Sequence, residues 1–304
     1  MKNHNTERKI KRRRSRLKQN GINPKHFSAS QLKFYAYLIP ICIVMGLPIL
    51  FIVSNAFKPM DELMAYPPRF FVKHPTLNNF LMLFNMSSTS SVPASRYLFN
   101  SVLTTVITVF GALLICSCSA FAFSKKKFKL KGFLFDINTI ALMFVPVAVA
   151  IPRYFVITYT GMLDSLWANI LPLLVIPTGV FLVKQFMDQL PDALIEAAVV
   201  DGASDYTIMA RIIMPLIKSP LSTVAILAFQ SAWNSVEAST YYINDESLKT
   251  FPFYMSTLSS TVGNAVVGKG ISAAATLLMF LPNLILFIIL QSKVMNTMAH
   301  SGIK

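Results

Sequence analysis

Residues 196–215 read EAAVVDGASDYTIMARIIMP, and they separate two strongly apolar segments of the chain. The wider stretch 184–218 contains five acidic and three basic residues, which gives it a net charge of −2. Charged side chains are seldom buried unless they are paired. We therefore expect this stretch to project into solvent or against another protein, as an ordered element with a function of its own.

Local signals within this stretch predict two short helices joined by a tight turn. Pro191 and Asp192 suit a helix start, because the first helical turn leaves N–H groups unpaired and these residues tolerate or satisfy them. Gly202 can adopt the left-handed conformation that ends a helix. Ser204 can cap a second helix, and Pro215 disfavours its simple continuation. A solvated linker would explain the polarity of the stretch but not this order of signals.

The rest of the chain is typical of an integral membrane protein. Of its 304 residues, 54% are hydrophobic and 13% are charged, and the mean hydropathy is +0.55. An uncharged run of about 20 residues can cross the hydrocarbon layer as a helix, which satisfies its own backbone hydrogen bonds there. We predict an all-α membrane domain over residues 34–304 with six spans, at about 34–57, 97–124, 133–159, 165–183, 219–236 and 271–292.

The basic residues predict the orientation of these spans. Residues 1–33 carry eleven Lys and Arg against the single acid Glu7, and five lysines lie within 125–131. Segments rich in Lys and Arg stay on the cytoplasmic side, so both termini are expected there. A basic tail could bind nucleic acid, but beside a membrane span it more often meets anionic lipid, and we predict no nucleic-acid partner. The segments expected outside are 58–96, 160–164 and 237–270.

One segment has the spacing of a nucleotide-binding loop. Residues 263–270 read GNAVVGKG, but Gly270 stands where a P-loop needs Ser or Thr for Mg²⁺, and no strand is predicted before it. The four histidines lack both a second histidine four residues on and a neighbouring carboxylate, which argues against a metal site or a catalytic base. We predict that the chain is not an enzyme and binds no metal or nucleotide cofactor itself.

The stretch 196–215 resembles the EAA loop of ABC-importer permeases. The similarity extends from about Phe34 to the C-terminus, although the Gly-rich tail common in that family is largely absent. Asp201-Gly202-Ala203 and Trp233-Asn234 resemble the carbohydrate-uptake branch, the MalG-like group of binding-protein-dependent inner-membrane components. The residues that match the loop motif are Glu196, Ala197, Ala198, Gly202, Ile212 and Pro215, with Met214 where Leu is usual.

The resemblance implies the fold of a type I importer permease, with a coupling helix in the loop 190–216 that docks in a groove on a cytosolic ATPase. Glu196 would pair with a basic residue of that groove, and Ala197 and Ala198 would permit close approach. Gly202 would set the bend, so that a bulky side chain there should uncouple ATP hydrolysis from uptake. The residues expected to couple to the ATPase are Glu196, Ala197, Ala198, Asp201, Gly202, Ile212 and Pro215.

The resemblance also implies partners. These are a second homologous permease subunit, two copies of an ATPase that hold ATP and Mg²⁺, and an extracytoplasmic solute-binding protein that contacts the segment 237–270. The chain would then form half of a pathway for sugars or oligosaccharides across the cell membrane. Another solute, or an ion-coupled secondary transporter, remains as an alternative, the latter less favoured because charged side chains fall near the predicted span ends.

Four residues near the end of the fifth predicted span are candidates for touching the substrate. They are Trp233, Asn234, Tyr241 and Tyr242. Aromatic rings stack on sugar faces, but aromatic residues near a membrane surface also form the interfacial belt. The sequence leaves both interpretations open.

Overall fold

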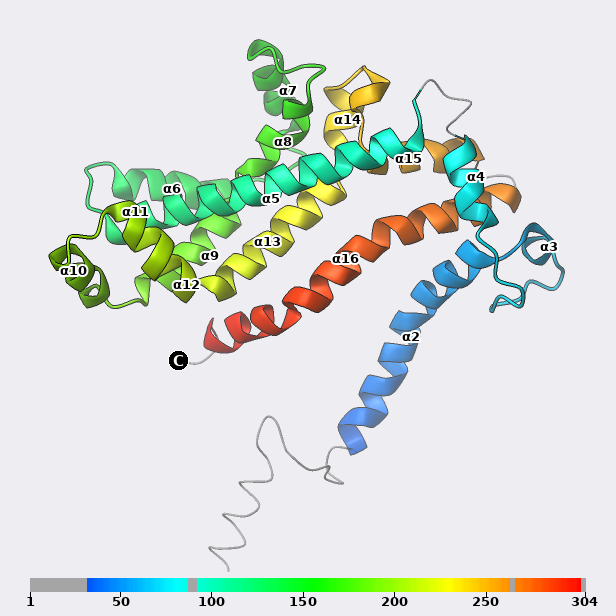
Figure 1. The fold of residues 1–304 in the computed structure, drawn as a ribbon, viewed down its shortest axis with the longest axis horizontal. Helices are drawn as coiled ribbons and strands as arrows, with labels where there is room; N and C mark the ends of the chain where they lie inside the picture. Colours follow the sequence, from blue (N-terminus) through cyan, green and yellow to red (C-terminus); the bar gives the residue numbers. More distant parts are fainter. Residues whose placement is uncertain (1–31, 87–91, 263–265, 302–304) are drawn as a thin grey trace, which may run out of the picture. The chain divides into compact units, whose positions relative to one another are not determined.

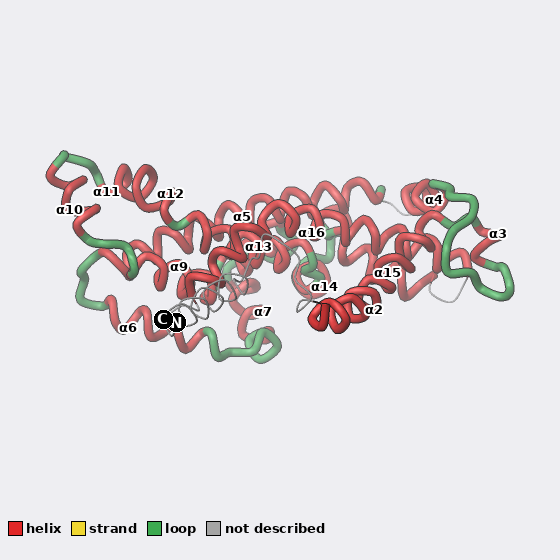
Figure 2. Tube along the Cα trace, turned by 90° about the horizontal axis from the view of Figure 1, so that it is seen from below, coloured by secondary structure: helices red, strands yellow, loops and turns green. Residues whose placement is uncertain are grey.

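The computed structural model describes residues 32–86, 92–262 and 266–301, so the basic tail 1–31 and part of the segment 263–270 lie outside the described residues. Within the described part the chain is helical and has no strand (Figures 1 and 2). The chain divides into two units, residues 1–52 and 53–304. The all-α architecture predicted from the sequence is confirmed.

The first unit contains most of one apolar helix. Helix α2 covers Leu32–Phe57, and its last five residues belong to the second unit. Pro40 and Pro48 lie inside it without interrupting it. The helical segment Phe34–Phe57 is long and apolar enough to cross a membrane, in agreement with the first predicted span.

Most helices lie in the second unit. The long ones are α5 (Ala94–Lys125), α13 (Lys218–Trp233) and α16 (Val266–Ser301). The shorter helices are α3 (Met60–Leu63), α4 (Asn78–Met86), α6 (Lys131–Ala141), α7 (Ala150–Tyr159), α8 (Leu166–Leu174), α9 (Pro177–Asp188), α10 (Ala193–Val200), α11 (Asp205–Thr207), the π-helix η2 (Ile208–Ile213), α12 (Met214–Leu216), α14 (Glu237–Tyr241), the 3₁₀ helix η3 (Glu246–Leu248) and α15 (Phe251–Val262).

Helix α5 is the centre of the packing in this unit. Helices α8, α9 and α13 pack along it, and α13 lies between α5 and α16 (Figure 1). Gly179 of α9 lies close to α5: a Cβ at this position would lie 2.9 Å from Sγ of Cys116. The missing side chain lets α9 lie directly on α5, and the helices α10–α12 follow from its end.

Among the described residues, four helical segments are long and apolar enough to cross a membrane, or five if a bent pair counts as one span. Helices α5 and α16 contain the second and sixth predicted spans as single helices. Helices α8 and α9 together cover the fourth, with an interruption at Val175 and Ile176, directly before Pro177. Pro177 disfavours a helical conformation for the residue that precedes it, which explains this interruption.

The third predicted span is not a continuous helix. Instead of one helix over 133–159, α6 ends at Ala141 and α7 begins at Ala150. Pro146 lies in the gap, where it lacks an N–H and restricts the residue before it. Pro152 causes no break, because it stands in the first turn of α7, where the N–H groups have no helical partner. The count of six spans therefore stays a prediction.

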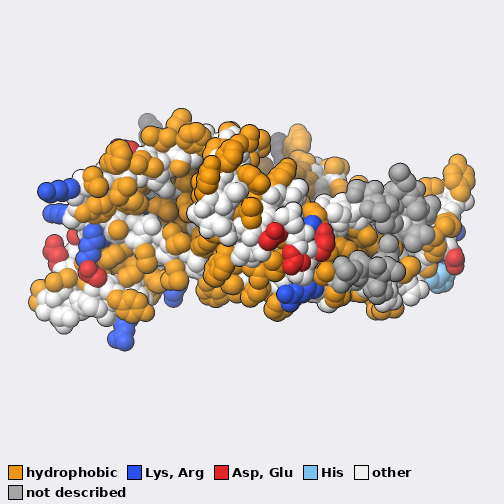
Figure 3. All heavy atoms as spheres, turned by 90° about the horizontal axis from the view of Figure 1, so that it is seen from above, with side chains coloured by type: hydrophobic (Ala, Val, Ile, Leu, Met, Phe, Trp, Pro, Cys, Tyr) orange, Lys and Arg blue, Asp and Glu red, His pale blue; other side chains and the backbone are white. Residues whose placement is uncertain are grey.

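Hydrophobic side chains cover much of the surface, as expected for a chain in contact with lipid. On the face seen in Figure 3, acidic and basic side chains lie next to one another in a few places between large apolar areas. Among the exposed apolar residues are Phe110 and Leu114 on α5, and Ile285, Ile288 and Ile289 on α16. The chain's own packing leaves these faces uncovered.

Candidate functional site: the 190–216 loop

The loop 190–216 begins with a helix that ends in a left-handed glycine. Helix α10 covers Ala193–Val200, and Gly202 has φ +79°. The N–H of Gly202 donates to the carbonyl of Val199 (3.0 Å), and the N–H of Ala203 donates to that of Ala198 (2.9 Å). This pair of hydrogen bonds is the Schellman arrangement, which requires a left-handed residue at the position of Gly202. The predicted turn is confirmed.

A second helical segment follows the turn. Ser204 is its N-cap, and its Oγ accepts the N–H of Thr207 at 3.3 Å. The segment runs through α11, the π-helix η2 and α12, and it bends by 86° into the helix that follows. As expected, the helix does not simply continue beyond Pro215: Pro215 lies in the short helix α12, and the break comes two residues later at Ile217. The π-helical turn before Pro215 changes the hydrogen-bond spacing that a proline would otherwise disrupt.

One face of the loop packs into the membrane domain. Ala198 is 7% exposed, and Ile208 and Ile213 are fully buried. They belong to one hydrophobic cluster with Cys116, Ala120 and Phe121 of α5 and Val180, Val183 and Met187 of α9. Burying a side chain of this size contributes about 1.5–3 kcal/mol, so the loop is held as a folded element rather than as a linker.

The opposite face of the loop is apolar and uncovered. Leu194, Val199, Val200 and Tyr206 are exposed to 43%, 56%, 86% and 81%. Side chains of this kind next to a charged stretch mark a surface that another protein can cover. Glu196 and Asp201 are also exposed, and their carboxylates have no hydrogen bond or ion pair among the described residues. The outward face therefore offers apolar contacts and two free negative charges.

The other acidic residues of this region are paired with lysines. Asp192 binds Lys125 (2.7 Å), Asp205 binds Lys126 (2.5 Å), and Asp188 binds Lys184 (2.6 Å). The hydrogen bond from Lys125 and then its charge lower the pKa of Asp192, which stays ionised. Asp192 precedes α10, but its side chain makes no capping hydrogen bond, so it does not satisfy an N–H group of the first turn as expected from the sequence. The pairs join the loop to the lysine-rich segment 125–131.

The structure separates the predicted coupling residues into two groups. Glu196, Ala197, Asp201, Gly202 and Pro215 are exposed. Ala198 is buried in the chain's own core, and Ile212 is partly buried against the same cluster. A small residue at 198 therefore serves the packing of α10 on this chain, because a larger one would push α10 away from its neighbours. Helix periodicity could have assigned this inward face.

The four predicted substrate contacts do not form one site. Trp233 is 4% exposed, its Nε1 donates to the carbonyl of Met279 (3.0 Å), and its ring stacks on Phe229. Tyr242 is 2% exposed and donates to Glu237 (2.8 Å). Asn234 is exposed, and Tyr241 is 64% exposed. Tyr241 and Tyr242 line one cavity of about 420 Å³.

The segment 242–251 was missed as an ordered element by sequence reasoning. Asn100 of α5 donates to the carbonyls of Ser247 (2.8 Å) and Lys249 (2.9 Å), and Ser101 accepts the N–H of Phe251 (2.8 Å). Asp164 accepts the backbone N–H groups of Asn244 and Asp245. The available signal was the presence of Asn100 and Ser101 in an apolar helix, where buried polar groups need partners.

Comparisons with known proteins identify the family of the chain. Residues 33–293 match the model of the family described as "Binding-protein-dependent transport system inner membrane component". The chain belongs to this family. It is therefore a permease component of an ABC transporter and a multi-pass membrane protein, and its family works with an ATPase and a binding protein.

Two relatives and one solved structure illustrate the similarity. The chain is 27% identical to the galactooligosaccharides transport system permease protein GanQ of Bacillus subtilis, over 89% of this chain and 94% of the relative. It is 28% identical to the arabinooligosaccharides transport system permease protein AraQ of Halalkalibacterium halodurans, over 87% and 93%. A chain of a bacterial ABC transporter that imports the acidic polysaccharide alginate has the same fold, with a TM-score of 0.74 at 18% identity, over 88% and 98% of the two chains.

Proposed function

We propose that this permease forms half of a translocation pathway for sugars or oligosaccharides, and that the 190–216 loop couples it to a cytosolic ATPase. The observation that carries the proposal is the two-sided loop. Its inner face is fixed to α5 and α9, while its outer face presents apolar side chains and the unpaired Glu196. A force applied to the outer face would be transmitted to the helices because the loop is packed on them.

The sugar assignment is supported by the relatives and by the chemistry of the chain. Both relatives described above are named for oligosaccharides. Exposed Asn234 and Tyr241 are side chains of the kinds that bind sugars, through hydrogen bonds and ring contact. Trp233 and Tyr242 would act indirectly, by holding the helices that carry exposed residues.

The orientation and the partners complete the proposal. Lys125 and Lys126 of the lysine-rich segment 125–131 pair with acidic residues of the loop, so the positive-inside rule supports a cytoplasmic position for the loop and for both termini. The segment 237–270 would then be available to a solute-binding protein outside. A second permease and two ATPase copies would complete the importer, and ATP with Mg²⁺ would bind to those ATPases.

The test uses the assembled importer in proteoliposomes with ATP and the loaded binding protein. Glu196→Lys should lower both ATPase association and uptake by at least tenfold, because it places a positive charge against a basic groove. Asp61→Lys, at an exposed acid outside the loop, is the matched control and should leave both unchanged. Normal uptake by Glu196→Lys would contradict the coupling role. Wild-type uptake that needs no ATPase and stops when an ion gradient is removed would instead indicate a secondary transporter.

A further inference from the structure

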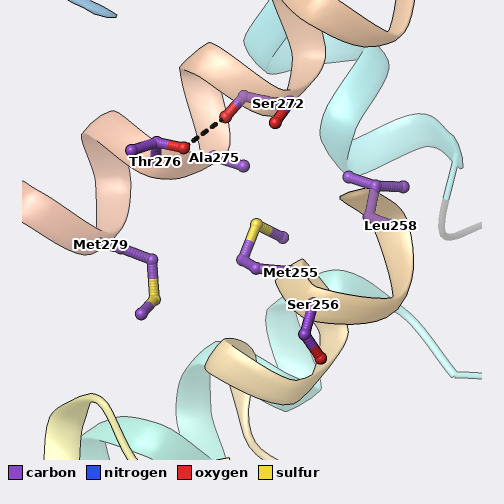
Figure 4. A pocket seen from close by; sticks show the side chains of 7 residues that line it. All are labelled: Met255, Ser256, Leu258, Ser272, Ala275, Thr276 and Met279. Atoms are coloured by element: carbon purple, nitrogen blue, oxygen red, sulfur yellow. Dashed lines mark hydrogen bonds between the residues drawn. The ribbon is translucent and has the colours of Figure 1, made fainter. Parts of the chain in front are cut away.

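A cavity of about 240 Å³ lies between α15 and α16 and has polar atoms in its wall. It is lined by Met255, Ser256, Leu258, Ser272, Ala275, Thr276 and Met279 (Figure 4). On α16, Ser272, Thr276 and Met279 follow one another at spacings of four and three residues, so they share one face of the helix. The cavity is thus built by one side of each helix.

This cavity lies at a depth where lipid contact would be unfavourable for its hydroxyl groups. Residues 268–291 of α16 are the candidate span, and Thr276 comes eight residues after its start, about 12 Å along the helix. Ser256 and Thr276 are both exposed. A polar group facing hydrocarbon is costly, whereas one facing a water-filled path is not. The exposed hydroxyls therefore indicate that this face borders water or solute.

The hydrogen bonds of these hydroxyls define what they can recognise. The Oγ of Ser256 donates to the carbonyl of Phe253 (2.7 Å), and the Oγ1 of Thr276 donates to the carbonyl of Ser272 (2.8 Å). These two hydroxyls have each used their single proton and keep only acceptor capacity, whereas the Oγ of Ser272 has no hydrogen bond among the described residues and can still donate. Acceptors bind the O–H groups of a solute but repel carboxylate or phosphate oxygens.

The rest of the lining agrees with an uncharged solute. None of the seven lining residues is acidic or basic, so nothing among them would compensate a charge on the solute. The thioethers of Met255 and Met279 offer adaptable apolar contact to the C–H face of a sugar ring. Trp233 supports this wall by its hydrogen bond to the carbonyl of Met279 (3.0 Å).

The geometry points to this cavity as the surface of the subunit that contacts the transported solute, and to a neutral, polyhydroxylated solute as its ligand. The inference rests on the proposed transport function. It adds to that function the cavity that contacts the solute and the expectation that the solute is uncharged. It also gives Trp233 a positioning role, since its ring holds the segment of α16 that carries Thr276 and Met279.

The first experiment measures access of water to the cavity. Ser256→Cys and Thr276→Cys are made in a chain with Cys42→Ser and Cys118→Ser, which keeps only the buried Cys116. The assembled importer is treated from either side of the membrane with a membrane-impermeant trimethylammonium methanethiosulfonate. Both cysteines should react at least tenfold faster than Ile285→Cys, which lies nine residues beyond Thr276, about half a turn around the helix, and is 55% exposed.

The second experiment tests the ligand. Three neutral trisaccharides are supplied with the binding protein: maltotriose, galactotriose and arabinotriose. At least one of them should slow labelling of Thr276→Cys at least threefold, whereas a uronic acid trisaccharide should not slow it. Thr276→Trp, which fills the cavity, should lower uptake at least tenfold while ATPase stimulation by the loaded binding protein stays within twofold. Ile285→Trp is the matched control and should do neither.

The outcomes separate this inference from the transport function. Failure of both cysteines to react from either side, or unchanged uptake by Thr276→Trp, would overturn the cavity assignment. Protection by the uronic acid trisaccharide alone would overturn the neutral class. Loss of ATPase stimulation together with uptake in Thr276→Trp would overturn the solute-contact role. A wild-type importer without ATP-dependent uptake would contradict the proposed function, and the labelling rates would still test the aqueous cavity because they need no transport.

Discussion

The two ends of α5 are attached to neighbouring segments by different chemistry. At one end Lys126 reaches Asp205, and these two side chains are 43% and 63% exposed. Lys125, whose side chain is 5% exposed, reaches the 75% exposed Asp192 and the carbonyl of Leu190. At the other end Asn100, which is fully buried, holds two carbonyls of the segment 242–251. Exposed ion pairs contribute about 0–1 kcal/mol, while a buried polar group left without its partner costs about 1–3 kcal/mol.

This difference suggests which end can move. The 190–216 loop is fixed by a hydrophobic cluster on its inner face and by ion pairs that solvent can replace, so it can shift when a partner presses on its outer face. The segment 242–251 is fixed through its backbone and should move together with α5. Four predictions test this contrast, from the largest expected effect to the smallest.

Replacement of the buried amide should have the largest effect. Asn100→Leu leaves the carbonyls of Ser247 and Lys249 without donors, and we expect it to lower the free energy of unfolding by about 2–4 kcal/mol. Denaturation of the purified subunit in detergent measures the change. The control is Asn78→Leu, the same substitution at an exposed site, which should change stability by less than about 0.5 kcal/mol. Equal effects of the two variants would remove the contrast between the ends of α5.

The turn of the loop comes next. Gly202 has φ +79°, and no atom lies within 4 Å of a Cβ built there, so a substitution is limited by conformation rather than by space within the subunit. Gly202→Val should lower ATP-driven uptake at least tenfold, because a β-branched residue is strained in the left-handed region. Gly202→Asn tolerates that region and should keep uptake within about threefold. Equal loss in both variants would show that the docked ATPase, not the backbone, requires glycine.

The carboxylate of Asp164 predicts a pH dependence of the segment 242–251. Hydrogen bonds from the backbone and side chain of Asn244, and then from the backbone of Asp245, lower the pKa of Asp164. The stabilisation is therefore present above the unfolded value of about 3.9 and is lost as the pH falls through the lower folded value. Hydrogen exchange at Asn244 and Asp245, corrected for intrinsic rates, should accelerate in that range. Asp164→Asn should abolish the pH dependence, and its persistence there would assign it to another group.

Salt should have the smallest effect, and it should act on the loop end. The side chains of Lys126 and Asp205 are 43% and 63% exposed, so raising the ionic strength from about 0.1 M to about 1 M should screen their attraction. Hydrogen-exchange protection near Asp205 should fall by up to about fivefold, equivalent to about 1 kcal/mol. Protection of 242–251 should not change. Lys126→Gln should remove the salt dependence, and a salt effect of equal size at both ends would contradict the comparison.

The elements predicted correctly are those with strong local signals. Long uncharged runs became α2, α5 and α16, and the order of Gly202 and Ser204 in the loop produced the expected turn. The error came in the third predicted span, where Pro146 lies in a break between α6 and α7 while Pro152 causes none. The effect of a proline depends on its place in a helical turn and on neighbouring hydrogen bonds, which residue spacing does not reveal.

The sequence by itself determined that this protein is a helical membrane protein with a polar two-helix loop, because hydropathy, charge and turn chemistry are local properties. The permease function was implied by the resemblance of residues 196–215 to the EAA loop. Only the tertiary structure decided that Ala198 packs into a cluster with residues of α5 and α9, and that Trp233 is buried against α16. It also decided that Ser256 of α15 and Thr276 of α16 line one cavity. These relations depend on how distant helices pack, and packing geometry is a property of the folded chain.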